Sequence, residues 1–210
     1  MKTNLIKKEF TIQQIKTNHE IYLERIAFYK KLGFDHIKAR KNVLKQIDQT
    51  DYKNILEIGT GKGYLSTLLA KKYNDVVSLD INQEDLEIAA MNAAYEKVQN
   101  NIAFILQNCE ELNYKPQSFD AVISVFTFHH LDKPFQVVNE MLRIFKHNLI
   151  ISDFNNNGIK IIERAHASQN RHHKYANHQF NILPCYLKEK GYSFIETEDE
   201  WQKIYVIERM

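Results

Sequence analysis

The sequence predicts an α/β fold in which a mainly parallel, seven-stranded sheet is covered by helices on both faces. Between residues 53 and 153, short apolar runs bounded by turn residues alternate with segments of helical periodicity. Such alternation is typical of parallel strands joined by crossover helices. Two further strand-like runs lie a short turn apart near the end of the chain, and they predict an antiparallel C-terminal strand.

A helical cap is predicted to precede the sheet. Thr11 and Gln14 have the spacing of a capping box, and apolar residues then recur at steps of three and four up to Tyr29. Gly33 ends this helix, and Asp35 is placed to cap a second helix that runs to Ile47.

The remaining elements follow in order along the chain. Strands are predicted at 53–58, 75–80, 102–107, 119–125 and 148–153, with helices near 62–73, 83–98 and 132–146. The C-terminal part is predicted to contain helices at 158–170 and 178–190 and strands at 192–197 and 203–208. We find no internal repeat or linker. We therefore expect one domain, 1–210, made of a cap (1–50), a core (51–154) and a C-terminal part (155–210).

The composition excludes several classes of protein. Among 210 residues, 28 Lys and Arg nearly balance 26 Asp and Glu, which argues against a dedicated nucleic-acid or membrane-surface binder. The two cysteines lie far apart, so neither a disulfide framework nor a zinc site is expected. Because the sequence has no signal-peptide pattern and no apolar run of about 18 residues, we expect a soluble, cytoplasmic protein.

The most informative feature is a glycine turn after the first predicted strand. The stretch 54–63 reads N-I-L-E-I-G-T-G-K-G, with glycines at every second position and a helical pattern from Tyr64. Glycine allows a ligand to approach the backbone closely, and a helix start offers unpaired N–H groups to polar or anionic groups. The order of strand, glycine turn and helix predicts a bound nucleotide-like cofactor.

The glycine spacing separates two classes of cofactor. The dinucleotide pattern G-x-G-x-x-G would need its third glycine at Tyr64, whereas this chain has it at Gly63. The resulting pattern, E-x-G-x-G-x-G from Glu57, resembles the class I S-adenosylmethionine-dependent methyltransferases. The resemblance covers roughly residues 53–154. It implies a Rossmann-like, doubly wound fold, S-adenosyl-L-methionine as cofactor and S-adenosyl-L-homocysteine as product.

The resemblance implies a set of cofactor-binding residues. The turn itself supplies Gly59, Thr60, Gly61 and Gly63. Asp80, at the end of the second strand, is expected to accept hydrogen bonds from two ribose hydroxyls, as an acidic residue does in dinucleotide folds. Its neighbour Ile81 is expected to pack on the adenine. The alternative interpretations are a helix-capping aspartate and an ordinary core isoleucine.

Three further positions complete the implied cofactor site. Asn108 and Cys109 match an acidic-Ala-x-x-Leu segment that reads the adenine edge, although Asn108 replaces the usual Asp. Glu57 is expected to organise the methionine half of the cofactor, or else to be a satisfied carboxylate at a strand end. The run 118–131, in which Val125 ends the fourth strand, resembles the small-molecule branch of the family, and this resemblance implies that Val125 lies beneath the reacting methyl group.

The resemblance implies methyl transfer to a small-molecule acceptor by in-line displacement, for which no catalytic side chain is obligatory. Alignment of the reacting groups is worth about 7–11 kcal/mol, more than a single general base contributes. His129 and His130 are the candidate bases, and His129 is preferred. Alternatively, one ring caps the next helix and the other packs against the cofactor.

The stretch from Arg164 to Lys188 contains no Asp or Glu. It holds several basic residues and histidines: Arg164, His166, Arg171, His172, His173, Lys174, His178 and Lys188. The hypothesis is that this segment favours an anionic or carboxylate-bearing acceptor, and a solvated helix face is the alternative. No metal site is expected, because there is no i, i+4 pair of histidines and no carboxylate nearby.

Other functions stay open at this stage. The segment 124–127 lacks the Pro-Pro-aromatic run of base amino-group methyltransferases, and Cys185, which follows Pro184, has a helical setting unlike that of a cytosine-C5 nucleophile. Methylation of RNA or protein, and an inactive subunit that only binds the cofactor, are the alternatives. A dehydrogenase is a weaker one. Nucleic acid is not the expected partner, and the oligomeric state does not follow from the sequence.

Overall fold

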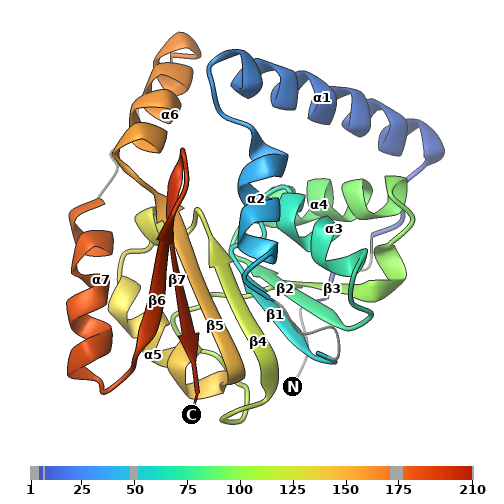
Figure 1. Ribbon diagram of the computed structural model, residues 1–210. Helices are drawn as coiled ribbons and strands as arrows, with labels where there is room; N and C mark the ends of the chain where they lie inside the picture. Colours follow the sequence, from blue (N-terminus) through green and yellow to red (C-terminus); the bar gives the residue numbers. More distant parts are fainter. Residues whose placement is uncertain (1–4, 7, 48–51, 171–176, 210) are drawn as a thin grey trace.

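The sheet in the computed structural model has seven strands in the order β3-β2-β1-β4-β5-β7-β6, and β7 runs antiparallel to the other six. The structure describes residues 5–6, 8–47, 52–170 and 177–209. The strands are β1 (Ile55–Ile58), β2 (Val76–Asp80), β3 (Ile102–Leu106), β4 (Phe119–Val125), β5 (Phe145–Phe154), β6 (Phe194–Glu198) and β7 (Gln202–Glu208). The predicted mainly parallel sheet with an antiparallel C-terminal strand is confirmed (Figure 1).

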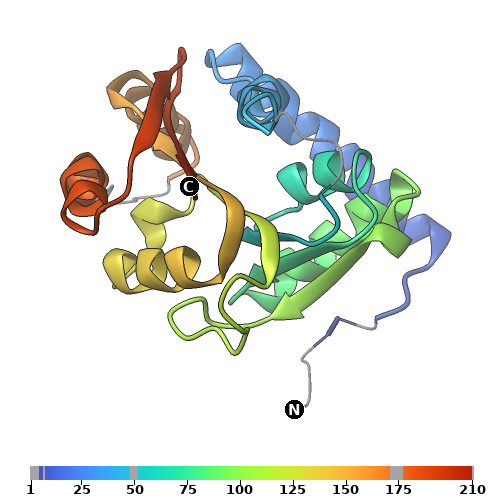
Figure 2. The same ribbon diagram turned by 60° about the horizontal axis from the view of Figure 1, so that its bottom comes forward.

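Helices cover both faces of the sheet, which Figure 2 shows as two layers on either side of the strands. The cores separate in the same way: α2, α3 and α6 pack on one face, where α4 also lies over β3, and α5 and α7 pack on the other. The helices are α1 (Ile12–Lys31), α2 (His36–Leu44), α3 (Tyr64–Ala70), α4 (Gln83–Tyr95), α5 (Pro134–Ile144), α6 (Asn156–Ser168) and α7 (Asn177–Glu189).

The helical cap is fastened to the hairpin between β6 and β7. The indole Nε1 of Trp201 donates to the carbonyl of Gly33 (2.7 Å), and the amide of Gln202 donates to the carbonyl of Ala39 (2.8 Å). Asn42 of α2 donates to Asp199 (2.8 Å). These bonds join segments more than 150 residues apart, so they fix α2 against the carboxyl ends of the central strands.

Most element boundaries agree with the sequence to within three residues, and β4 coincides with its predicted range. The start of β6 is an instructive difference, because the strand begins at Phe194 and not at Tyr192. Gly191 has a left-handed φ of +81°, and the N–H of Tyr192 donates back to the carbonyl of Leu187 (3.0 Å). Tyr192 is therefore used to close α7, as in a glycine-based helix cap, and is not part of the strand.

Within the described part of the chain, no helix combines the length and the apolar character that a membrane span requires.

Candidate functional site

The candidate site lies at the carboxyl edge of the sheet, where β1 and β4 are neighbours and the strand order changes direction. Open α/β sheets bind ligands in the crevice outside such a switch point. The glycine turn follows β1, Asp80 ends β2, and the segment Phe126–His130 follows β4. The topology thus brings together the segments that the sequence analysis selected.

The glycine turn has a backbone that other residues would strain. Gly59, Gly61 and Gly63 have φ values of +82°, +50° and +76°. A Cβ on Gly59 would lie 2.0 Å from Oγ1 of Thr127, and a Cβ on Gly63 would lie 2.8 Å from the Cβ of Ala89. A Cβ on Gly61 would have no atom within 4 Å, so the turn is packed against protein at its two ends and open in the middle. That open middle fits a cofactor lying along the backbone.

Asp80 is tied to the glycine turn. Its Oδ2 accepts the N–H of Gly61 (2.7 Å), and its Oδ1 accepts the N–H of Asn82 (2.9 Å). The next residue, Ile81, exposes 73% of its surface, which is unusual for a large apolar side chain. An anchored carboxylate beside an exposed apolar side chain fits the ribose and adenine roles that the resemblance implies.

Glu57 is buried on the face of the sheet that α3 covers. The hydroxyls of Ser66 in α3 and Ser78 in β2 both donate hydrogen bonds to its Oε2. The hydroxyl of Thr60 lies 2.6 Å from the hydroxyl of Ser78. Burial raises the pKa of Glu57 to about 7, although the two serine hydroxyls and the charge of Arg40 lower it. The carboxyl group is therefore already paired beneath the glycine turn.

The adenine-edge segment forms a tight turn after β3. The side-chain oxygen of Asn108 accepts the N–H of Glu110 (2.9 Å), so this oxygen stabilises the turn and has one lone pair left for a ligand. Cys109 packs against the core, and burial raises the pKa of its thiol to about 11. Such a thiol is chiefly protonated at neutral pH, which makes a reactive role unfavourable.

The exit of β4 contains a strained residue. Val125 is buried, and Phe126 after it has a φ of +56°, which a bulky side chain rarely adopts. The ring of Phe126 stacks on Phe154 at 4.1 Å, and its N–H donates to the carbonyl of Ser152 (2.9 Å). Strain of this kind persists where the surroundings hold the backbone firmly, and it is frequent at functional sites.

His129 forms a buried pair with Asp153, the residue before the end of β5. Its Nδ1 lies 2.7 Å and 3.0 Å from the two carboxylate oxygens, and its backbone N–H donates to Oδ2 (2.8 Å). The N–H of Phe154 also donates to Asp153 (2.7 Å). A carboxylate at Nδ1 places the ring hydrogen there, which makes Nε2 the basic nitrogen. His130 is exposed and its ring centroid lies 4.0 Å from that of His129.

A second group of polar side chains lies where α2 covers the glycine turn. The guanidinium of Arg40 lies over the rings of Tyr64 (5.0 Å) and Phe126 (5.1 Å), and the His36 ring stacks on Tyr64 at 5.0 Å. Within the described chain, Nε2 of His36 and the hydroxyl of Tyr64 are buried without a hydrogen-bond partner. A buried polar group left unpaired costs about 1–3 kcal/mol.

The sequence analysis identified neither Asp153 nor the two residues of α2, His36 and Arg40. Asp153 ends an apolar run much as Asp80 does, and that position was an available signal. His36 and Arg40 lie one helical turn apart on α2, a pattern that surface helices share, so no signal distinguished them.

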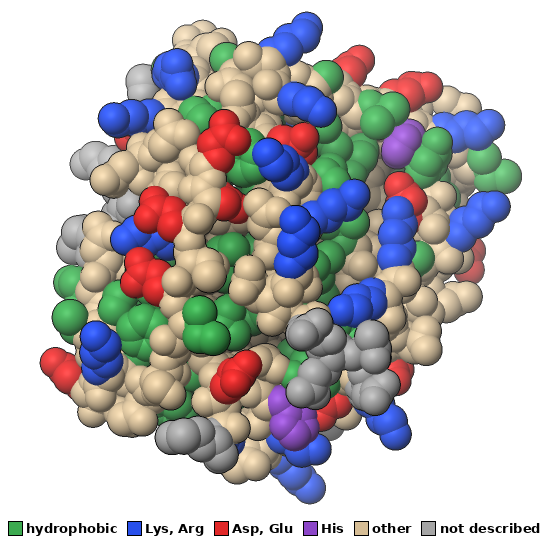
Figure 3. Space-filling model, in the orientation of Figure 1, with side chains coloured by type: hydrophobic (Ala, Val, Ile, Leu, Met, Phe, Trp, Pro, Cys, Tyr) green, Lys and Arg blue, Asp and Glu red, His purple; other side chains and the backbone are tan. Residues whose placement is uncertain are grey.

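The structure describes only part of the basic segment between Arg164 and Lys188. Arg164 is exposed on α6 and lines a shallow groove together with Lys160 and Glu163, and the amine of Lys188 lies 5.8 Å from the centroid of the Phe194 ring. Arg171, His172, His173 and Lys174 lie outside the described residues, as does the side chain of His178. On the face shown in Figure 3, acidic side chains are interspersed among the basic ones. Among the described residues, no group of His, Cys, Asp and Glu is arranged to hold a metal ion.

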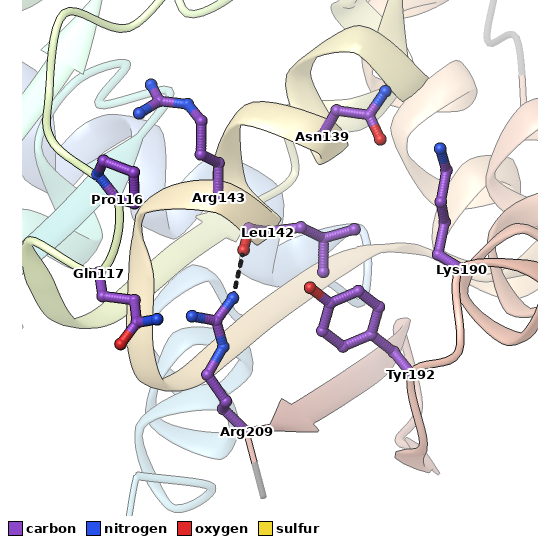
Figure 4. A pocket seen from close by; sticks show the side chains of 8 residues that line it. All are labelled: Pro116, Gln117, Asn139, Leu142, Arg143, Lys190, Tyr192 and Arg209. Carbon is purple, nitrogen blue, oxygen red and sulfur yellow. Dashed lines mark hydrogen bonds between the residues drawn. The ribbon is translucent and has the colours of Figure 1, made fainter.

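A groove of about 450 Å³ lies elsewhere on the molecule (Figure 4). It is lined by Pro116, Gln117, Asn139, Leu142, Arg143, Lys190, Tyr192 and Arg209. Gln117 precedes β4 and Arg209 follows the antiparallel β7, so the groove lies at the amino ends of the parallel strands. It is therefore separate from the crevice at the carboxyl edge.

Comparisons with known proteins agree with this geometry. A family model described as a methyltransferase domain matches residues 49–208, and the chain belongs to that family. The ubiquinone/menaquinone biosynthesis C-methyltransferase of Rhizobium rhizogenes is 26% identical over 139 residues, which is 64% of this chain and 50% of that protein. The chain thus spans about half the length of this curated relative.

Two solved structures share the fold. A protein of Methanococcus maripaludis assigned as an S-adenosyl-L-methionine-dependent methyltransferase has a TM-score of 0.69 at 19% identity, with 97% of this chain and 95% of that chain covered. The magnesium protoporphyrin IX methyltransferase of Synechocystis with bound cofactor has a TM-score of 0.59 at 16% identity, with 97% and 87% covered. The resemblance to class I S-adenosylmethionine-dependent methyltransferases is confirmed, and S-adenosyl-L-methionine is the cofactor of the family.

Proposed function

We propose that the protein transfers the methyl group of S-adenosyl-L-methionine to a small-molecule acceptor by in-line displacement. The Rhizobium relative is named for quinone biosynthesis and the Synechocystis structure for a porphyrin, which supports a small-molecule acceptor. The sulfonium supplies an already activated methyl group, so the protein has to bind, orient and exclude water. The glycine turn, Asp80, Ile81, Asn108 and the Cys109 backbone hold the cofactor, and Val125 with Phe126 lies beneath the methyl group.

We further propose that His129 removes the proton of the acceptor. The single observation that supports this role is the buried pairing of its Nδ1 with Asp153 at 2.7 Å. The carboxylate orients the ring, fixes the tautomer and stabilises the imidazolium that forms when Nε2 takes a proton. Asp153 is then a positioning residue. A base of this kind favours acceptors that must lose a proton, such as a hydroxyl or an acidic C–H group.

The acceptor class is tested by following the label from methyl-labelled S-adenosyl-L-methionine. We expect label in the small-molecule fraction of a cell extract. Label in RNA or protein, or no transfer by a protein that binds the cofactor, would replace the proposal with one of the alternatives above.

The role of His129 is tested with H129N and D153N. We expect kcat to fall roughly 10²–10⁴-fold in H129N and the affinity for S-adenosyl-L-homocysteine to stay unchanged. Both variants should also alter the dependence of kcat on pH. H147N is the control, because His147 is a half-exposed histidine at the start of β5, at the opposite edge of the sheet. If H129N retained both kcat and the pH profile, His129 would be structural.

An anionic acceptor is also proposed, on the strength of the basic excess between Arg164 and Lys188. Reversing the charges of Arg171 and Lys174 should raise the KM of the acceptor steeply while cofactor affinity stays the same. Unchanged kinetics would remove this part of the proposal.

A further inference from the structure

Some of the donors around Arg40 lack an acceptor among the described residues. Nη1 of Arg40 contacts Nδ1 of His36 (3.3 Å) and the carbonyl of His36 (3.1 Å), and these are its hydrogen bonds among the described residues. A guanidinium is only a donor, so Nδ1 of His36 accepts and the ring hydrogen lies on Nε2. Burial, together with the positive charges of Arg40 and Arg25, lowers the pKa of His36 well below its usual range, so the ring is neutral.

Three side chains that can donate hydrogen bonds therefore lie in contact with one another: Arg40, His36 and Tyr64. Among the described residues, the Nε2–H of His36 and the hydroxyl of Tyr64 are buried without a partner. Tyr64 as a residue is 6% exposed. Buried polar groups in proteins are normally hydrogen-bonded, and a set made of donors with one positive charge is complementary to an anionic group that accepts several bonds.

Arg40, His36 and Tyr64 lie beside the segments that form the crevice. Tyr64 directly follows Gly63 of the glycine turn, and Phe126, whose ring lies under the same guanidinium, directly follows β4. The bonds from Trp201 and Gln202 hold α2 in place above both segments. A planar guanidinium that packs on two aromatic rings is pre-organised to bind a carboxylate through two hydrogen bonds.

We propose that Arg40, His36 and Tyr64 form a carboxylate-binding site at the corner between α2, the glycine turn and the exit of β4. This proposal rests on the proposed function. The carboxylate could belong to the methionine portion of the cofactor or to an acceptor that carries a carboxylate. In either case the site adds a specificity determinant that comes from the helical cap.

The first arm of the test compares S-adenosyl-L-methionine with its decarboxylated form by calorimetry. If the site binds the carboxylate of the cofactor, R40M should weaken the intact compound roughly 10- to 150-fold and leave the decarboxylated one unchanged. Y64F, which removes only the hydroxyl, should weaken the intact compound about tenfold. R40K should fall between R40M and the unmodified protein, because an ammonium keeps the charge without the planar fork.

The second arm tests an acceptor carboxylate. Benzoate and succinate are titrated onto the protein saturated with S-adenosyl-L-homocysteine, and thermal stability is measured. If the site binds the acceptor, either anion should stabilise the unmodified protein and not R40M. K38M is the control in both arms: Lys38 lies on the same helix but its amine packs over Trp201 (5.1 Å), so no change is expected.

The site is overturned if R40M weakens both cofactor forms equally, or if R40M matches the unmodified protein in both arms. Because both readouts are binding measurements, they are independent of turnover. A protein that transfers no methyl group but shows the Arg40-dependent carboxylate effect would contradict the proposed function and retain this site.

Discussion

The strand side and the helix side of the crevice differ in whether their buried polar groups have hydrogen-bond partners within the protein. On the strand side, the acceptors are paired within the protein: Glu57 with two serine hydroxyls, and Asp80 with the N–H of Gly61. On the helix side, the Nε2–H of His36 and the hydroxyl of Tyr64 have no partner among the residues that the structure describes. A ligand hydroxyl that bonds Asp80 therefore joins a carboxylate that already accepts two N–H groups, whereas a ligand acceptor at the helix side gives the buried donors their first partners.

This difference suggests that the two sides contribute differently to ligand binding. The strand-side groups are held in place by bonds within the protein and accept a ligand only in the correct geometry, so the strand side mainly selects and orients. Relief of unpaired buried donors contributes more, so the helix side mainly adds affinity. The glycine turn lies between the two parts, and its backbone must keep its shape for either to function.

The largest expected effect comes from breaking that turn. In G59A, a Cβ must fit at a φ of +82° and 2.0 Å from Oγ1 of Thr127, so we expect destabilisation of roughly 3 kcal/mol or more and no measurable binding of S-adenosyl-L-homocysteine. Urea unfolding and calorimetry measure the two effects. The matched control is G191A, which has a similar φ of +81° but open space around the Cβ. It should cost about 1 kcal/mol and leave binding intact. Equal losses in both variants would show that backbone strain, and not the close contact, governs the turn.

The next effect concerns the buried carboxyl on the strand side. An ordinary glutamate has a pKa of 4.5, and that of Glu57 is raised to about 7. Between these values the native state holds a proton that the unfolded state releases. The free energy of unfolding therefore falls as pH rises from 4.5 to 7, by about 3 kcal/mol, and this contribution is constant above pH 7.

Unfolding by urea at pH 5, 6, 7 and 8 tests this contribution. E57Q has no titrating group at the site, so the stability of the unmodified protein relative to E57Q should decrease from pH 5 to pH 7 and then level off. E163Q, which changes an exposed carboxylate on α6, is the surface control. A flat difference for E57Q would mean that the serine hydroxyls and Arg40 offset the cost of burial.

A smaller effect is expected at Asp80. In D80N, the cofactor loses charge-assisted hydrogen bonds to its ribose, so affinity for S-adenosyl-L-homocysteine should fall roughly 10- to 100-fold. D85N is the control: Asp85 is a nearby carboxylate paired with Lys62 (2.6 Å) at a partly exposed position, and such pairs contribute little. If D80N and D85N behaved alike, the role of Asp80 would be confined to holding Gly61.

The sequence was sufficient for the elements and for the residues that belong to one local pattern. Alternation of strands and helices follows from periodicity, and Glu57 to Gly63 form one continuous motif whose chemistry is local. Asp153 and Arg40 are different, because their roles depend on neighbours far along the chain. Asp153 reaches His129 only because β5 pairs with β4 in the register that sets Ser152 beside Val125. Arg40 reaches Tyr64 only because Trp201 and Gln202 hold α2 in place.

The smallest expected effect is on the reactivity of Cys109, at the adenine end of the strand side. Its reactivity shows whether this end of the site is as well ordered as the glycine turn. Because burial raises the pKa of this thiol to about 11, only about one molecule in a thousand carries the thiolate at pH 8. A disulfide reagent should therefore label the exposed Cys185 of α7 rapidly and Cys109 slowly, as mass spectrometry of the two peptides would show. S-adenosyl-L-homocysteine should slow the labelling of Cys109 further and leave Cys185 unchanged. Rapid labelling of Cys109 in the folded protein would mean that the adenine end opens in solution, and that the strand side is pre-organised only around the glycine turn.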